Sequence, residues 1–230
     1  MRTAGMIAGF FRQTDDVLRR RSWTTRSAGS VVALAKLAAT LTVFSMLYGA
    51  VMGSFAGIGG ERNWHLLFVA SKVPLLLLTT SLICLPSFFV CNTLFGLRDD
   101  FPEAVRALAA TQAGLAIILA SLAPLTGVWY ATSSDYGNAI LFNALMFAVA
   151  SFGAQGLLRG FYRPLIARNG RHRFLLWIWI GIYAFVGIQM GWVLRPFIGD
   201  PNAPVQFFRE GAWSNAYVVV IRLVGAAMGN

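Results

Sequence analysis

Charged residues are scarce in this sequence, and their scarcity argues against a soluble fold. Only 12% of the 230 residues are charged, whereas 57% are hydrophobic, and the mean hydropathy is +0.64. A soluble domain usually contains about a quarter charged residues. The composition therefore predicts an integral membrane protein.

Cysteine, histidine and catalytic motifs are equally rare. Cys84 and Cys91 fall in one apolar run, roughly two helical turns apart, which is too far for a disulfide between them. The two histidines, His65 and His172, fall on opposite predicted sides of the membrane. The sequence contains no Gly-rich phosphate loop, no Cys-x-x-Cys, no His-x-x-x-His and no Gly-x-Ser-x-Gly. We therefore expect no disulfide framework, metal site, cofactor or catalytic site.

Acidic residues are also few, and none of the nine lies in the middle of an apolar run. Proton-coupled carriers and many ion pumps place a carboxylate at membrane depth, so this common signature is missing. The formal net charge of +10 would favour nucleic-acid binding in a soluble protein. Here the arginines lie in short segments between apolar runs, where they set membrane orientation. The expected partners are the lipid bilayer and other membrane subunits or further copies of the chain, without nucleic acid.

Five apolar runs are long enough for transmembrane helices, which need about 20 residues each. They cover residues 30–55, 73–95, 104–128, 138–158 and 174–194. The expected fold is an all-α polytopic helical bundle with about five transmembrane helices. We divide the chain into an amphipathic N-terminal arm (1–29), the bundle (30–197) and a C-terminal segment (198–230). The last run, 216–228, is short for a crossing and is left open as an interfacial helix, a packed cap or a sixth span.

Prolines and acids suggest where some of these helices begin. Pro74 is expected in the first turn of the second span, and the short apolar stretch 64–70 before it is expected to lie in the interface. Pro86 is expected to kink the same span, because proline removes a backbone donor and clashes with the preceding turn. Asp99 or Asp100 is expected to cap the third span.

Lysine and arginine positions indicate the orientation of the bundle. Six lie in the N-terminal arm, two between the second and third spans, and five between the fourth and fifth spans. The other side of the membrane has five, namely Arg62, Lys72, Arg195, Arg209 and Arg222. Because positive residues accumulate on the cytoplasmic side, the N-terminus is expected inside. With five spans, the C-terminal segment is then outside.

The N-terminal arm is expected to form an amphipathic helix over residues 5–21. Apolar residues there recur at roughly helical spacing, and the other face is basic. The positions that would meet anionic headgroups are Arg12, Arg19, Arg20 and Arg21. A helix packed on the protein's own cytoplasmic loops is an equal alternative.

The segment after the fifth span combines arginine with aromatic residues, the residue types enriched in binding hot spots. Prolines at 196, 201 and 204 stiffen it, which lowers the ordering cost of binding. We expect these side chains either to close the outer face and anchor it at the headgroups, or to dock a partner. The residues are Trp192, Arg195, Phe197, Phe207, Phe208, Arg209, Trp213 and Tyr217.

Polar residues inside or beside the spans outline a further candidate site. A small permease or channel could use them around a pathway next to the expected kink at Pro86. The residues are Lys36, Lys72, Gln112, Asn143 and Gln155. In the alternative reading, Lys36 extends its ammonium to the interface, and the amides only bond neighbouring helices.

Several segments resemble a recurrent pattern in uncharacterised bacterial polytopic membrane proteins, sometimes labelled Yip1-like or actin-binding WH2-like. They are residues 192–199, 207–210 and 215–217, together with 72–77, 85–86 and 92–96. The Yip1 resemblance implies five spans with a cytoplasmic N-terminus, although the Asp-Leu-x-Gly-Pro motif is absent. We reject the WH2 label, since the nearest actin-binding pattern, residues 34–40, lies inside the first span. The resemblance implies a bacterial cytoplasmic (inner) membrane protein.

Three functional hypotheses follow, none of them enzymatic. The leading one is an accessory or assembly subunit of a larger membrane complex, because small residues line the helices and aromatic residues follow the fifth span. The alternative is a small permease or channel. A second alternative is a membrane-surface scaffold or sensor that acts through the arginines of the N-terminal arm.

Overall fold

The computed structural model describes residues 2–21, 31–60, 62–200, 204–209 and 211–218, and within these ranges it contains helices and no strand. Five of the helices are long and apolar enough to cross a membrane. The chain is therefore an all-α, multi-pass membrane protein, as the composition predicted. Of the terminal run 216–228, only the first three residues fall within the described ranges, so the choice between an interfacial helix, a packed cap and a sixth span lies outside them.

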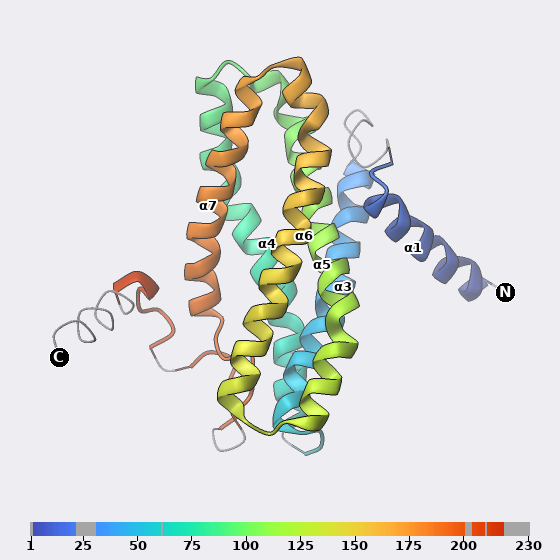
Figure 1. Ribbon diagram of the computed structural model, residues 1–230, viewed down its shortest axis with the longest axis vertical. Coiled ribbons are helices and arrows are strands. Elements are labelled where there is room, and N and C mark those ends of the chain that lie inside the picture. Colours follow the sequence, from blue (N-terminus) through green and yellow to red (C-terminus); the bar gives the residue numbers. More distant parts are fainter. Residues whose placement is uncertain (1, 22–30, 61, 201–203, 210, 219–230) are drawn as a thin grey trace.

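The bundle consists of five long helices, and a separate helix precedes it (Figure 1). The first helix, α1, covers Arg2–Leu18, and two 3-10 turns, η1 and η2, cover Ser54–Ala56 and Arg98–Asp100. The long helices are α3 (Val31–Gly53), α4 (Arg62–Leu94), α5 (Phe101–Thr132), α6 (Tyr136–Arg168) and α7 (Arg171–Val193).

The five long helices pack side by side in the order α7, α4, α3, α5 and α6, and this row does not close into a ring. α3 packs against both α4 and α5, α7 packs mainly on α4, and α6 packs mainly on α5, while α6 and α7 have little contact with each other. We call the end that has the turn 133–135 and the segment 194–218 the cap end. The opposite end, where α6 turns into α7, is called the basic end.

Three of the long helices exceed the expected spans. α4, α5 and α6 have 33, 32 and 33 residues, about 48–50 Å at 1.5 Å per residue, against about 30 Å of hydrocarbon. α4 begins at Arg62, so the separate interfacial stretch expected at 64–70 is wrong. α6 continues to Arg168 and α7 begins at Arg171, so all five arginines of the expected basic loop lie on helices, three on α6 and two on α7.

Close packing explains the early start of α4. A Cβ built on Gly49 of α3 would lie 2.6 Å from the carbonyl oxygen of Val69, and one on Gly53 would lie 3.0 Å from the Cα of Leu66. The two glycines therefore let α3 and the first turns of α4 approach closely. α4 continues through both Pro74 and Pro86, so Pro74 is not the first turn of this helix.

Asp100 lies at the N-terminus of α5, but its side chain makes no capping hydrogen bond, so that expectation is wrong. Its carboxylate instead accepts from Arg168 at 2.5 Å and lies 3.0 Å from the Nε2 of His172, which is fully buried. Glu103 accepts a second hydrogen bond from Arg168 at 3.1 Å. These carboxylates link the start of α5 to the end of α6 and the start of α7.

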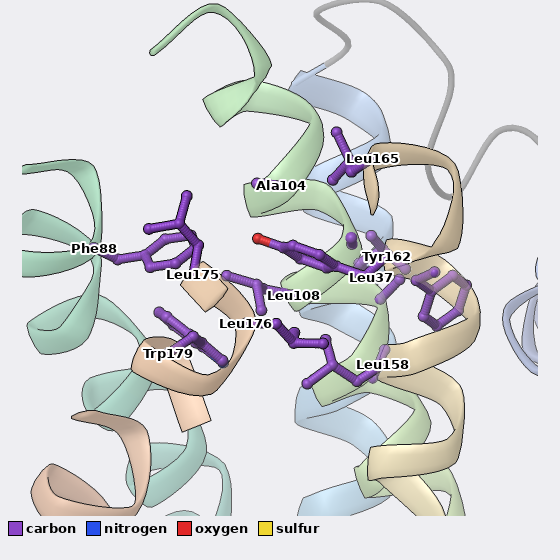
Figure 2. Packing of buried hydrophobic residues seen from close by; sticks show 14 of the residues in the cluster. Leu37, Phe88, Ala104, Leu108, Leu158, Tyr162, Leu165, Leu175, Leu176 and Trp179 are labelled. Carbon is purple, nitrogen blue, oxygen red and sulfur yellow. The ribbon is translucent and has the colours of Figure 1, made fainter. Parts of the chain in front are cut away.

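Two apolar cores stabilise the bundle, one near each end. Figure 2 shows the core at the basic end, where Leu158 and Tyr162 of α6 meet Leu108 of α5 and Leu175 and Trp179 of α7. Burial of such side chains is the main stabilising contribution in the water-exposed ends of the bundle. Within the membrane, the fit between neighbouring side chains decides the packing.

The N-terminal helix α1 projects from the side of the bundle near the start of α3 (Figure 1). Val17 is fully buried, the ring of Phe10 stacks on Phe44 with centroids 5.5 Å apart, and Gln13 donates to the Oγ1 of Thr40 at 2.6 Å. Phe11, in contrast, is 62% exposed. The expected helix is confirmed, and it packs on the protein through one face while an apolar side chain remains exposed.

Candidate functional site

The chain after α7 folds back over the cap end of the bundle. The buried Nζ of Lys72 donates to the carbonyl oxygen of Pro196 at 2.8 Å, and the hydroxyl of Tyr136 donates to that of Ile198 at 3.4 Å. Arg62 donates to the carbonyl oxygen of Asp200 at 3.3 Å. These bonds attach residues 196–200 to both α4 and α6.

Gly199 is needed for this close approach. A Cβ at that position would lie 2.6 Å from the Cβ of Ala56 and 2.8 Å from the imidazole of His65. Any larger residue would push the segment away from the bundle. The Nε2 of His65 is buried and has no hydrogen-bond partner among the described residues.

Most of the expected partner-binding aromatic residues contact the protein itself. The ring of Phe207 lies 5.4 Å from that of Phe68 and 4.9 Å from the Nζ of Lys72. Phe197 packs on the core at the cap end, and Tyr217 stacks on Phe185 with centroids 4.7 Å apart. These residues therefore do not form one exposed docking surface.

Two of the aromatic residues remain accessible. Trp213 is 79% exposed and Phe208 is 41% exposed, with their ring centroids 5.8 Å apart. Their position near the cap end suits either the headgroup region or a partner protein.

Arg195 and Arg209 form a positively charged opening, which we call the mouth. The guanidinium carbon of Arg195 lies 3.2 Å from the ring centroid of Trp192, and its Nε donates to the carbonyl oxygen of Trp192 at 3.2 Å. The backbone nitrogen of Arg209 donates to the carbonyl oxygen of Arg195 at 3.3 Å. Burial and the charge of Arg209 lower the pKa of Arg195. No ion pair joins either arginine to an acid of the described residues.

Two cavities meet at the mouth. The outer cavity has a volume of about 420 Å³, and Tyr136, Pro196 and Arg209 also border a smaller one of about 250 Å³. The smaller cavity adds Arg62 and His65, and Asp200 is the single acid among the described residues that line either cavity. The outer cavity is lined by Met52, Leu76, Tyr136, Ile140, Asn143, Ala144, Phe147, Arg195, Pro196, Phe197, Ile198 and Arg209.

A third cavity, also of about 420 Å³, lies deeper among α4, α5, α6 and α7. Leu76 and Phe147 line both this deep cavity and the outer one, so the two are adjacent. We call the combined space the cleft. The lining of its deep part is mainly apolar, with a few polar side chains: Thr80, Thr111, Gln112, Ser151, Gln155 and Tyr183.

Some of these deep polar groups already have partners and others do not. The hydroxyl of Tyr183 donates to the Oε1 of Gln112 at 2.9 Å, which joins α7 to α5. The hydroxyl of Thr80 is buried and has no hydrogen-bond partner within the described part of the chain. A mostly apolar cavity with a few polar groups is typical of small-molecule sites.

The cleft is long and is closed at the basic end. Its lining on α6 extends from Tyr136 to Leu158, about 33 Å by the helical rise. At the basic end it stops at Leu158 and Trp179, which belong to the packed core of Figure 2. Ser151 and the 56% exposed Ile188 line it on α6 and α7, so the cleft is open between these helices.

The structure brings together only part of the expected pathway. Gln112, Asn143 and Gln155 all line the cleft. Asn143 is also held by the hydroxyls of two tyrosines, Tyr48 and Tyr130, at 3.1 and 2.5 Å. Lys72 lies beside the mouth but is used to hold the cap segment, and the exposed Lys36 lies on α3 near the basic end, outside the three cavities.

The arginines expected at the membrane surface have mixed surroundings. Arg12 is exposed, whereas Arg19 pairs with Asp15 at 2.7 Å and Arg21 pairs with Asp16 at 3.8 Å. The side chain of Arg20 lies directly over Gly160 of α6. Acids or the bundle therefore already contact three of these four side chains.

Sequence reasoning missed Tyr136, Tyr183 and Thr80 as parts of the site. A signal for Tyr183 was present, since a tyrosine in the middle of an apolar run requires a hydrogen-bond partner. Tyr136 and Thr80 resemble ordinary interfacial and helix-packing residues, and only the fold places them beside the cleft.

No group of three or more His, Cys, Asp or Glu side chains that could hold a metal ion occurs among the described residues. A scan against protein-family models, a search of curated proteins and a search of solved structures found no match for this chain. The resemblance to Yip1-like proteins therefore stays a prediction, and the function is inferred from the geometry of the site.

Proposed function

We propose that this protein is a small, non-enzymatic permease that binds an amphipathic molecule in the cleft between α6 and α7. The supporting observation is that the outer and deep cavities are adjacent at Leu76 and Phe147, so that a charged mouth lies in line with polar side chains at membrane depth. The charge distribution and the Yip1-like resemblance favour a bacterial cytoplasmic membrane with the mouth outside.

The closed basic end fits one state of an alternating-access cycle. Transporters expose one site to each side in turn, rather than keeping a continuous pore. In this protein, α7 packs mainly on α4 and has little contact with α6. A movement of the α4–α7 pair relative to the α5–α6 pair would open the basic end by separating the core of Figure 2 and the contact between Asp100 and His172.

The test is to purify the protein from its own membrane in a gentle detergent and to identify retained small molecules by mass spectrometry. A Cβ on Gly187 would lie 3.6 Å from Thr80 across the deep cavity, so Gly187→Leu fills the cleft. Gly181→Leu on the same helix is the matched control, because no atom lies within 4 Å of its Cβ. We expect wild type and Gly181→Leu to retain a molecule that Gly187→Leu does not.

The retained molecule is then loaded into proteoliposomes, where wild type should move it across the bilayer and Gly187→Leu should not. Retention that is equal in both glycine variants, or no movement by the wild type, would contradict the permease proposal. The melting temperatures of both variants are measured first and compared with that of the wild type, so that loss of fold is not mistaken for a blocked cleft.

An accessory subunit of a larger membrane complex is the second candidate. The exposed pair Phe208 and Trp213 favours it, because these large aromatic side chains remain accessible beside the cap. The same purification tests it: a stoichiometric protein partner that is lost from Trp213→Ala would support this candidate. A lone protein under gentle conditions would argue against it.

A further inference from the structure

The described side chains that line the mouth are more often positive than negative. Arg195 and Arg209 line it, and Arg62 and the single described acid, Asp200, line the smaller cavity beside them. Arg195 and Arg209 are close enough to repel each other, and neither forms an ion pair with a described acid. Unpaired arginines at the rim of a cavity favour an anionic ligand, since charge-assisted hydrogen bonds are among the strongest polar contacts.

The cleft below the mouth lacks a wall on one side. Ser151, Ala184 and Ile188 line it from α6 and α7 and are all exposed, so an occupant at this depth would contact the surrounding acyl chains. A polar solute in that position would lose its hydration without gaining partners on the open side. An apolar chain meets no such penalty.

The charged lining of the outer cavity lies at its rim. Below Arg195, Arg209 and Tyr136, the one polar side chain among the described lining residues is Asn143, whose amide already bonds Tyr48 and Tyr130. The other walls are apolar and include Leu76 and Phe147. The charge is therefore at one end and the apolar surface extends from it toward the middle of the membrane. That arrangement matches a molecule with a charged head and an apolar chain.

Taking the cleft of the proposed permease as the binding site, we propose that its ligand is an anionic membrane amphiphile. The anionic head lies between Arg195 and Arg209 at the mouth. Its apolar chain extends past Leu76 and Phe147 into the cleft, and the molecule enters sideways between α6 and α7 from the leaflet at the cap end.

The test uses native mass spectrometry of the full chain in a neutral detergent. Dioleoyl phosphatidylglycerol is the anionic probe, and dioleoyl phosphatidylcholine is its zwitterionic match. Inorganic phosphate is the control for a small anion without an acyl chain. We expect the wild type to bind phosphatidylglycerol at least about tenfold more tightly than phosphatidylcholine, and to show no saturable binding of phosphate. The variant Arg195→Gln/Arg209→Gln should lose about tenfold in affinity for phosphatidylglycerol, because two charge-assisted contacts are removed.

The matched control is Arg98→Gln/Arg173→Gln, which removes two exposed arginines at the basic end. It should bind phosphatidylglycerol like the wild type. If the double mouth variant proves unstable, Arg209→Gln alone removes an exposed side chain and should still weaken binding. Equal binding of the two lipids, an equal loss in the basic-end variant, or competition by phosphate alone would overturn the assignment.

The outcomes also separate this inference from the permease proposal. Selective lipid binding at the mouth without transport of any retained molecule would contradict the permease and leave the ligand assignment standing. If the protein transports a retained solute but binds both lipids equally, the permease proposal stands and the ligand assignment is contradicted. Gly187→Leu should weaken phosphatidylglycerol binding while Gly181→Leu does not, which places the chain in the cleft.

Discussion

Single residues determine how the segment 196–200 is held against the bundle, and Lys72 is the clearest example. An ammonium group buried near the membrane is costly unless polar or aromatic groups surround it. The Nζ of Lys72 donates a hydrogen bond to the carbonyl oxygen of Pro196 at 2.8 Å and lies 4.9 Å from the ring centroid of Phe207. The residue is fully buried. A residue expected from the sequence in a transport pathway thus has a structural contact that explains its burial.

Replacement of Lys72 by methionine should weaken the attachment of residues 196–200 to the bundle. The side chain keeps its length but loses the donor for the carbonyl oxygen of Pro196, which costs about 1–3 kcal/mol when a buried acceptor is left unpaired. We expect faster amide hydrogen exchange in residues 197–200 and a lower melting temperature in detergent. Lys36→Met is the control, because that side chain is exposed on α3. Unchanged exchange in Lys72→Met would show that the bond to Pro196 does not hold the segment.

At the scale of whole elements, glycine positions set how closely helices approach. α3 and α4 meet where Gly49 and Gly53 face Val69 and Leu66, with a built Cβ on Gly49 only 2.6 Å from a backbone oxygen. A backbone atom cannot rotate away as a side chain can. The pair of helices therefore depends on the absence of a Cβ at this position.

Gly49→Ala should separate α3 from α4 and destabilise the protein by about 1–3 kcal/mol, the usual cost of overpacking. Gly156→Ala is the matched control, because it adds the same methyl group to α6 where no atom lies within 4 Å. The control should be neutral or stabilising by up to about 1 kcal/mol, since alanine favours the helix. Thermal unfolding in one detergent compares the two variants, and a wild-type melting temperature for Gly49→Ala would refute the prediction.

The sequence predicted the helices better than their ends or contacts. Five apolar runs indicated five membrane helices, because about 20 apolar residues cross a bilayer regardless of the neighbouring helices. The start of the second span was placed at Val73, eleven residues after the true start of α4, because the packing that extends the helix to Arg62 depends on glycines in α3. Asp100 looked like a helix cap, but its partners, Arg168 and His172, lie on distant segments that only the fold brings close.

The candidate site was predictable only in part, for the same reason. Gln112, Asn143 and Gln155 stood out as amides in apolar runs, and all three line the cleft. Arg195 and Arg209 were singled out as partner contacts, yet both border the outer cavity. The residues that the two cavities share are Leu76 and Phe147, which are ordinary apolar residues in the sequence.

The whole molecule is asymmetric along the membrane normal. The cap end has the mouth and the cavities, whereas the basic end is closed by a packed core and has carboxylate–arginine links. Positive residues accumulate on the cytoplasmic side of membrane proteins, so the expected orientation directs the mouth outward. This orientation also decides which leaflet supplies the amphiphile proposed above.

Thiol labelling in intact cells tests that orientation. Cys84 and Cys91 are first replaced by alanine, and single cysteines are then introduced as Ser134→Cys at the cap end and Ala167→Cys at the basic end, both at exposed positions. A membrane-impermeant maleimide should label Ser134→Cys in intact cells and Ala167→Cys only after permeabilisation. The opposite pattern would show the reverse orientation of the bundle. Arg195 and Arg209 would then face the cytoplasm, and the same cleft would take its ligand from the inner leaflet.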